Sequence, residues 1–325
     1  MRPWRHGDRD EPVSDRARGG GRRAGPDGGG EDRRGGGAPT SGPRCPGGGS
    51  VSGAVGAIAA WEFRLAARAR WILAMGAVFA LLAGGVTFLA LGRVRSLGST
   101  GIGPAGAALV NLGVLLPSLM GLLLGAGSFA GERDHGMLAL LLAQPIQPGR
   151  VVLGAFLGLA GSLWATLGIG YGVALLLLSA VARGHDVLAI AVLVGSTFAV
   201  AAVGVAVGAA LAAWSRRRLQ ALALATALWI ALALGFDLAL AAVAPTVRLG
   251  PGGLLVAVLM NPLEAGRILA LLGMELEGTA LGPFGAYLLV RFGTAGSIAL
   301  LAADLIAWEA APLALARSVL SRGDL

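Results

Sequence analysis

Three titratable residues lie close together at Glu132, Asp134 and His135, where an acid, a base or a metal ligand could act. A hydrolase or transferase would need these groups to converge on one reacting atom beside a nucleophile. At helical spacing, neighbouring positions point in different directions around the axis, so the three side chains diverge. No nucleophile lies alongside them. We therefore reject an intramembrane hydrolase or transferase and predict no catalytic residue.

The residue types that the chain lacks restrict its chemistry further. All 26 basic residues are arginine, and a P-loop needs a lysine to reach the transferred phosphates. Any ATP-driven function must therefore use an ATPase site on another subunit. The single cysteine, Cys45, and three scattered histidines have no metal-ligand spacing. We predict no metal and no cofactor, and the scattered arginines behind the net charge of +8 do not indicate a nucleic-acid partner.

Long apolar stretches follow one another after Arg70, in a chain that is 55% hydrophobic and 14% charged. About 20 apolar residues cross the hydrocarbon core as a helix, and lipid leaves no other way to satisfy the backbone of such a segment. We predict an all-α polytopic membrane protein with six transmembrane helices. The predicted spans are approximately residues 71–92, 108–131, 151–182, 187–214, 219–244 and 292–316.

Two segments precede the first span. Residues 1–50 are rich in Gly, Pro and Arg and almost free of apolar side chains, so we expect a disordered tail before a membrane domain at 51–325. Residues 57–70 predict an amphipathic helix in the membrane interface. Its apolar side would carry Ile58, Trp61, Leu65 and Ile72, and its polar side Glu62, Arg64 and Arg68.

Arginines distinguish the two sides of the membrane. The loops on the side of residues 57–70 carry more arginine than the opposite loops, and the run Arg216, Arg217 and Arg218 is the clearest marker. Positive charge is enriched on the cytoplasmic side. We therefore expect a bacterial inner-membrane protein with both termini in the cytoplasm.

Polar and small residues within the spans are further candidates for function. Ionisable groups inside a membrane are costly and commonly functional, which singles out Asp237, near the outer end of span five, and Asp304, which could face a cavity or pair with Arg291. Glycines four residues apart allow helices to approach closely. Such pairs occur at Gly121/Gly125, Gly154/Gly158, Gly168/Gly172 and Gly204/Gly208.

The cytoplasmic loop after the second span carries the most specific pattern, Glu-x-x-x-Gly-x-Leu-x-x-Leu-Leu-x-x-Pro. With it the chain resembles the ABC-2 family of transporter permeases over about residues 57–325, although Met137 stands where the family more often has threonine. In that family this segment is the coupling helix that docks on a separate ATPase. The resemblance assigns the role to Glu132, Arg133, Gly136, Leu138, Leu141, Leu142 and Pro145.

A second pattern covers residues 259–287 on the predicted outer side. Asn261 and Pro262 predict a turn before a short helix, on which Glu264 and Arg267 lie three residues apart on one face. This part resembles the branch of ABC-2 permeases that serves the maturation of nitrous oxide reductase. The resemblance implies a homodimer, two cytoplasmic ABC ATPase subunits and a periplasmic β-helix protein that could contact this loop. A weak surface ion pair in an ordinary outer cap is the alternative.

Three functions remain open at this point. The first is the ABC-2 permease that serves the copper–sulfur centre of nitrous oxide reductase. The second is a general ABC-2 exporter of lipid, drug or peptide. The third is a passive membrane scaffold for an assembly complex, which would not depend on an ATPase.

Overall fold

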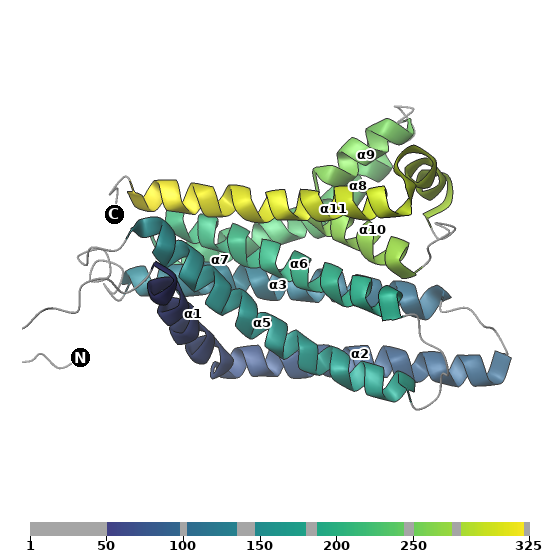
Figure 1. The fold of residues 1–325 in the computed structure, drawn as a ribbon, viewed down its shortest axis with the longest axis horizontal. Helices are drawn as coiled ribbons and strands as arrows, with labels where there is room; N and C mark the ends of the chain where they lie inside the picture. The colour runs from purple at the N-terminus through teal and green to yellow at the C-terminus, as the bar shows by residue number, and fades with distance from the viewer. Residues whose placement is uncertain are drawn as a thin grey trace, which may run out of the picture. The chain divides into compact units, whose positions relative to one another are not determined.

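The computed structural model describes residues 51–97, 103–134, 147–179, 187–243, 250–274 and 281–321, and all regular structure in these residues is helical. Figure 1 labels the α-helices, and a π-helix, η1, lies between α7 and α8. Their bounds are α1 Val51–Ala67, α2 Arg70–Leu97, α3 Gly103–Asp134, α5 Pro148–Ser179, α6 Val187–Trp214, α7 Arg218–Ile230, η1 Ala231–Gly235, α8 Phe236–Val243, α9 Pro251–Leu259, α10 Pro262–Met274 and α11 Gly282–Ser321. The predicted tail at 1–50 lies outside the described residues.

Six helical segments among the described residues are long and apolar enough to cross a membrane. They are α2, α3, α5, α6, the continuous run α7–η1–α8, and α11, so the predicted fold class is confirmed. One further helical pair stands out: α9 and α10 are bent by 114° at a short break around Asn261. The predicted turn before a short helix is therefore present. Figure 1 shows α8, α9 and α10 gathered at the end of the bundle away from the C-terminal end of α11.

The centre of the bundle is the contact between α3 and α6, where glycines let the two backbones meet. A Cβ atom added to Gly204 would lie 2.6 Å from the Ser118 carbonyl oxygen, and one added to Gly208 would lie 2.8 Å from the Ala126 nitrogen. Gly121 and Gly125 of α3 touch the α6 backbone in the same way. These two glycine pairs are therefore packing surfaces within one chain, because any side chain there would force the helices apart.

Helix α1 packs along α5. One residue of α1, Glu62, is not exposed as the predicted interfacial helix required. Gly154 and Gly158 of α5 receive α1, and a Cβ on Gly158 would lie 2.6 Å from the Cβ of Glu62. Glu62 is consequently only 3% exposed, so its placement on the polar side was wrong. Arg64 and Arg68 are exposed as predicted, and Trp61 remains 63% exposed.

Helix α11 is interrupted at Gly293, where φ is +71°. Side chains disfavour this left-handed region, so glycine is the residue that suits this break. Ser297 stabilises it by donating a hydrogen bond to the Gly293 carbonyl oxygen at 2.8 Å. The sixth predicted span, 292–316, therefore begins at a bend in the helix.

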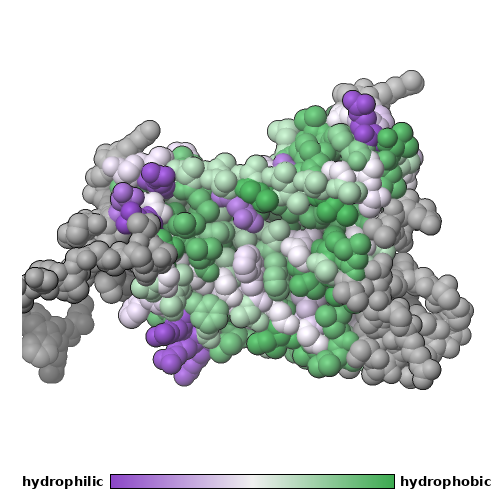
Figure 2. All heavy atoms as spheres, in the orientation of Figure 1, coloured by the Kyte–Doolittle hydropathy of each residue, from purple (hydrophilic) through white to green (hydrophobic). Residues whose placement is uncertain are grey.

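On the face that Figure 2 shows, apolar residues cover most of the described surface, and hydrophilic residues gather mainly towards its two ends. Many large apolar side chains are exposed on α2, α5 and the run α7–η1–α8. This distribution suits a protein whose sides face lipid tails.

Candidate functional site

The predicted coupling helix lies mostly outside the described residues. Glu132 and Arg133 belong to the last turn of α3, but their side chains are not described. Gly136, Leu138, Leu141, Leu142 and Pro145 lie in the undescribed segment 135–146. The residues that flank this segment are described. Nη1 of Arg218, at the start of α7, lies 4.0 Å from the place of a Cβ on Gly131, and Nε of Arg317 lies 3.0 Å from the place of a Cβ on Gly149. The last two spans therefore each approach a residue that flanks the segment.

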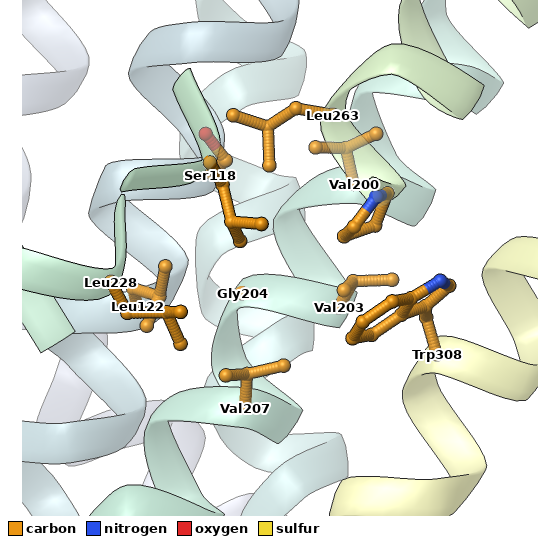
Figure 3. Close-up of a pocket in the computed structure, with 11 residues that line it drawn as sticks. Ser118, Leu122, Val200, Val203, Gly204, Val207, Leu228, Leu263 and Trp308 are labelled. Atoms are coloured by element: carbon orange, nitrogen blue, oxygen red, sulfur yellow. The ribbon is translucent and has the colours of Figure 1, made fainter. Parts of the chain in front are cut away.

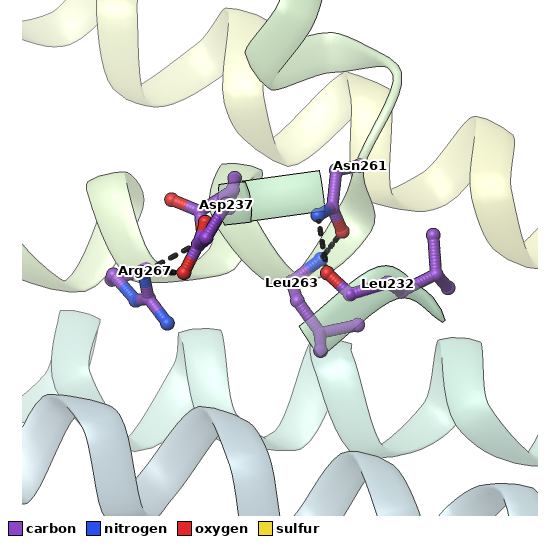
Figure 4. A network of polar contacts seen from close by, with 6 residues as sticks. Leu232, Asp237, Asn261, Leu263 and Arg267 are labelled. Atoms are coloured by element: carbon purple, nitrogen blue, oxygen red, sulfur yellow. Dashed lines mark hydrogen bonds and ion pairs between the residues drawn. The ribbon is translucent and has the colours of Figure 1, made fainter. Parts of the chain in front are cut away.

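Asn261 stands at the bend between α9 and α10 and is fully buried. Its Oδ1 accepts a hydrogen bond from the backbone N–H of Leu263 at 3.1 Å, which caps the N-terminus of α10. Its Nδ2 donates to the carbonyl oxygen of Leu232, in η1, at 2.9 Å. One side chain thus joins the bend to the π-helical turn of span five (Figure 4).

The sequence had assigned Asn261 and Pro262 to a partner-contact loop on the outer surface. Both residues are buried, since Asn261 has no exposed area and Pro262 lies inside the bundle at the start of α10. An asparagine followed by proline correctly indicated a turn, but it gave no sign that the amide would reach another helix. Contact of a partner with these two side chains would require them to become exposed.

Arg267 forms an ionic cluster with two carboxylates. Its Nη1 lies 2.7 Å from Glu264 Oε1, one helical turn away, and 3.8 Å from Asp237 Oδ2 in α8. The side chain of Glu264 is 14% exposed and that of Asp237 is 49% exposed. The structure therefore joins Glu264 and Arg267 to Asp237, which the sequence had treated separately as an intramembrane acid. Figure 4 shows Arg267 beside Asp237.

We expect Arg267→Ala to lower the free energy of unfolding by about 1–3 kcal/mol, because it leaves the poorly exposed Glu264 carboxylate without its charged partner. Denaturant unfolding in detergent, followed by tryptophan fluorescence, measures this change. Arg291→Ala removes an exposed arginine of α11 and is the matched control. The double variant Arg267→Ala, Glu264→Gln should recover part of the loss, whereas a fully additive double variant would contradict the ion pair.

A small apolar cavity of about 60 Å³ lies beside the bend, where five segments of the chain meet. Ser118 from α3, Val203 from α6, Leu228 from α7, Leu263 from α10 and Trp308 from α11 are among its lining residues (Figure 3). Two tryptophans form hydrogen bonds between helices beside the cavity. Trp308 Nε1 donates to the Leu259 carbonyl oxygen at 3.1 Å, and Trp229 Nε1 donates to Ser118 Oγ at 3.0 Å. Nothing in the sequence indicated that either tryptophan would donate a hydrogen bond to another helix.

Asp304 stands apart from this site. Within the described ranges it forms no ion pair with Arg291 and does not line the cavity, and its buried Oδ2 has no hydrogen-bond partner there. Asp237 and Asp304 are therefore placed differently, because only Asp237 joins the ionic cluster.

Comparison with known proteins identifies the family of the chain. The family model described as ABC-2 family transporter protein matches residues 56–325. The chain belongs to the ABC-2 transporter family. It is 32% identical over 263 residues to the "Probable ABC transporter permease protein NosY" of Stutzerimonas stutzeri, a match that covers 78% of this chain and 93% of the relative. The protein of the same name from Pseudomonas aeruginosa is 31% identical over 261 residues, with the same coverage.

The ABC-2 family assignment agrees with the architecture. The chain is a multi-pass membrane protein and the permease subunit of an ABC transporter, and such a subunit works with a partner ATPase. The matched region begins within α1 and includes both the predicted coupling segment and the bend at Asn261.

Proposed function

We propose that this ABC-2 permease subunit couples ATP hydrolysis by a separate cytoplasmic ATPase to the maturation of the copper–sulfur centre of nitrous oxide reductase. The observation that carries the proposal is the similarity, along 93% of their length, to two permeases named NosY. The pattern at residues 259–287, which resembles the permeases of that maturation system, supports it. In this proposal the permease transmits either a cargo or a conformational signal across the membrane.

In this proposal the ATPase docks on the coupling segment at 132–145, on the cytoplasmic side. Both termini face the cytoplasm, and the end of the bundle that holds α9 and α10 faces the periplasm. Closure of the ATPase dimer would push the coupling segment and the helices that contact its ends. Arg218 and Arg317 support this route, because they bring spans five and six to Gly131 and Gly149. Two copies of the chain, two ATPase subunits and a periplasmic β-helix protein complete the proposed assembly.

Mass spectrometry of proteins that co-purify with the tagged chain tests this assembly. The chain is extracted from native membranes in mild detergent, with an unrelated tagged membrane protein as the control. An ABC ATPase recovered with a periplasmic β-helix protein would support the maturation function. An ATPase without that partner would favour a general ABC-2 exporter of lipid, drug or peptide. Absence of any ATPase would contradict the coupling role and favour a passive scaffold.

A further inference from the structure

Span five, the run α7–η1–α8, is the least buried of the six candidate spans. The buried residues of α7 and η1 are Ala221, Ala225 and Ala233, and α8 has none. Alanine offers little apolar area, and burial stabilises in proportion to area. Fully buried side chains therefore contribute little to the position of span five, which also packs through the partly buried Leu222, Trp229 and Leu232.

Three polar contacts with other helices help to hold the described part of span five around η1. Trp229, just before η1, donates to Ser118, and Asp237, just after it, pairs with Arg267. Between them, Asn261 donates to the Leu232 carbonyl oxygen within η1 itself. Arg267 lies in α10 and Asn261 directly precedes that helix, so this one element supplies two of the three contacts (Figure 4).

The segment that these contacts hold contains the π-helical turn η1. In η1 the Phe236 N–H bonds to the Ala231 carbonyl oxygen, five residues back, so the hydrogen-bonded loop contains one more residue than that of an α-helix. π-helical turns are rare and commonly occur at functional sites. Asn261 supplies a donor to the Leu232 carbonyl from outside the helix.

The segment has a second possible arrangement, in which η1 is a regular α-helix. If η1 became regular α-helix, one residue would be taken up and α8 would turn by about 100°, the angle per residue of an α-helix. Asp237 would then leave Arg267, and the Asn261 hydrogen bond to η1 would break. Leu228 and Leu232 line the cavity, so this part of span five borders unfilled space on its packed side.

We propose that Asn261 is a positioning residue that holds span five in its π-helical register, and that η1 is the hinge at which span five changes register during the ATP-driven cycle. The hinge rests on the proposed function, because that function supplies the cycle. The positioning role of Asn261 rests on the contacts alone.

The substitution Asn261→Ser is expected to keep one hydrogen bond of the asparagine, the cap of α10, and to remove the other, to the Leu232 carbonyl oxygen. Its hydroxyl oxygen can still cap α10, since serine is a good N-cap, but the side chain is shorter than asparagine and lacks the second polar atom that reaches the Leu232 carbonyl. We expect Asn261→Ser in the full chain, in lipid nanodiscs, to speed hydrogen exchange of amides 231–238 about fivefold, the effect of one ordinary hydrogen bond. Exchange in α10 should stay unchanged. Asn111→Ser, at an exposed position of α3, is the matched control and should change neither segment.

Asn261→Ala distinguishes positioning from a loss of fold, because it removes the cap as well and should speed exchange in α10 and in 231–238 together. Unchanged exchange at 231–238 in Asn261→Ser, or a rise confined to α10, would overturn the positioning role.

The hinge is tested on the complex that the chain forms with its ATPase. Trapping the wild-type complex with ATP and vanadate should change exchange at 231–238 relative to the nucleotide-free complex, because a change of register gives these amides new hydrogen-bond partners. Equal exchange in the trapped and nucleotide-free complexes would overturn the hinge. If no ATPase binds the chain, the proposed function fails, and the nanodisc measurement on the chain alone still decides the role of Asn261.

Discussion

Gly136→Pro should abolish ATP-driven function while the protein still inserts in the membrane. The segment 132–145 is predicted to be a helix that transmits the movement of the ATPase, and proline inside a helix costs about 3 kcal/mol. If transmission requires this helix, that cost corresponds to a loss of activity of about 100-fold. ATPase activity of the complex and nitrous oxide reductase activity in cells measure the effect.

Gly136→Ala is the matched control for this substitution, because alanine is favourable in a helix and should preserve activity. Glu132→Ala tests the same segment through its charge and should also abolish maturation activity. Membrane fractionation and the elution volume of the solubilised chain establish that each variant inserts. Full activity in both Gly136→Pro and Glu132→Ala would rule out the coupling role.

The second large effect is expected at the contact between α3 and α6. Gly125→Val would place a branched side chain against the Val205 carbonyl oxygen and close to the Ala209 nitrogen, where only backbone now fits. Overpacking of a core typically costs about 1–3 kcal/mol, and here a backbone rather than a flexible side chain must move, so we expect at least about 3 kcal/mol. The variant should lose most of its folded yield.

Gly172→Val provides the comparison, because a Cβ at Gly172 meets no atom within 4 Å. Both substitutions add the same side chain to a glycine inside a predicted span. The folded fraction, from size-exclusion chromatography in detergent, and the melting temperature should fall for Gly125→Val alone. Equal melting temperatures of the two variants would show that the α3–α6 contact is not tight.

The sequence predicted the membrane-spanning helices, because their length and composition follow from the surrounding lipid. Apolar runs long enough to cross a bilayer indicated the six candidate spans, because lipid restricts such runs to helices. Glycine spacing indicated close helix contacts, but it could not say which helices meet. The structure shows that Gly121 and Gly125 face Gly204 and Gly208 in the same chain.

The site was less predictable because its contacts join distant parts of the chain. Glu264 and Arg267 lie three residues apart, so their ion pair follows from helical geometry. Asp237 joins them from 30 residues away, and Asn261 bonds to a backbone carbonyl, which no side-chain pattern reveals. Glu62 shows the opposite error, since helical periodicity placed it on the polar side although Gly158 leaves room for it against α5.

The backbone contact between α3 and α6 also determines which parts of the molecule can move relative to one another. Two helices whose backbones meet through Gly121, Gly125, Gly204 and Gly208 have no flexible side chains between them to absorb sliding. A shift of either helix would bring backbone atoms into collision, so α3 and α6 should travel as one rigid unit. Spin labels on these two helices would then keep their separation throughout the ATP-driven cycle, and the pair would serve as the fixed frame against which span five is displaced.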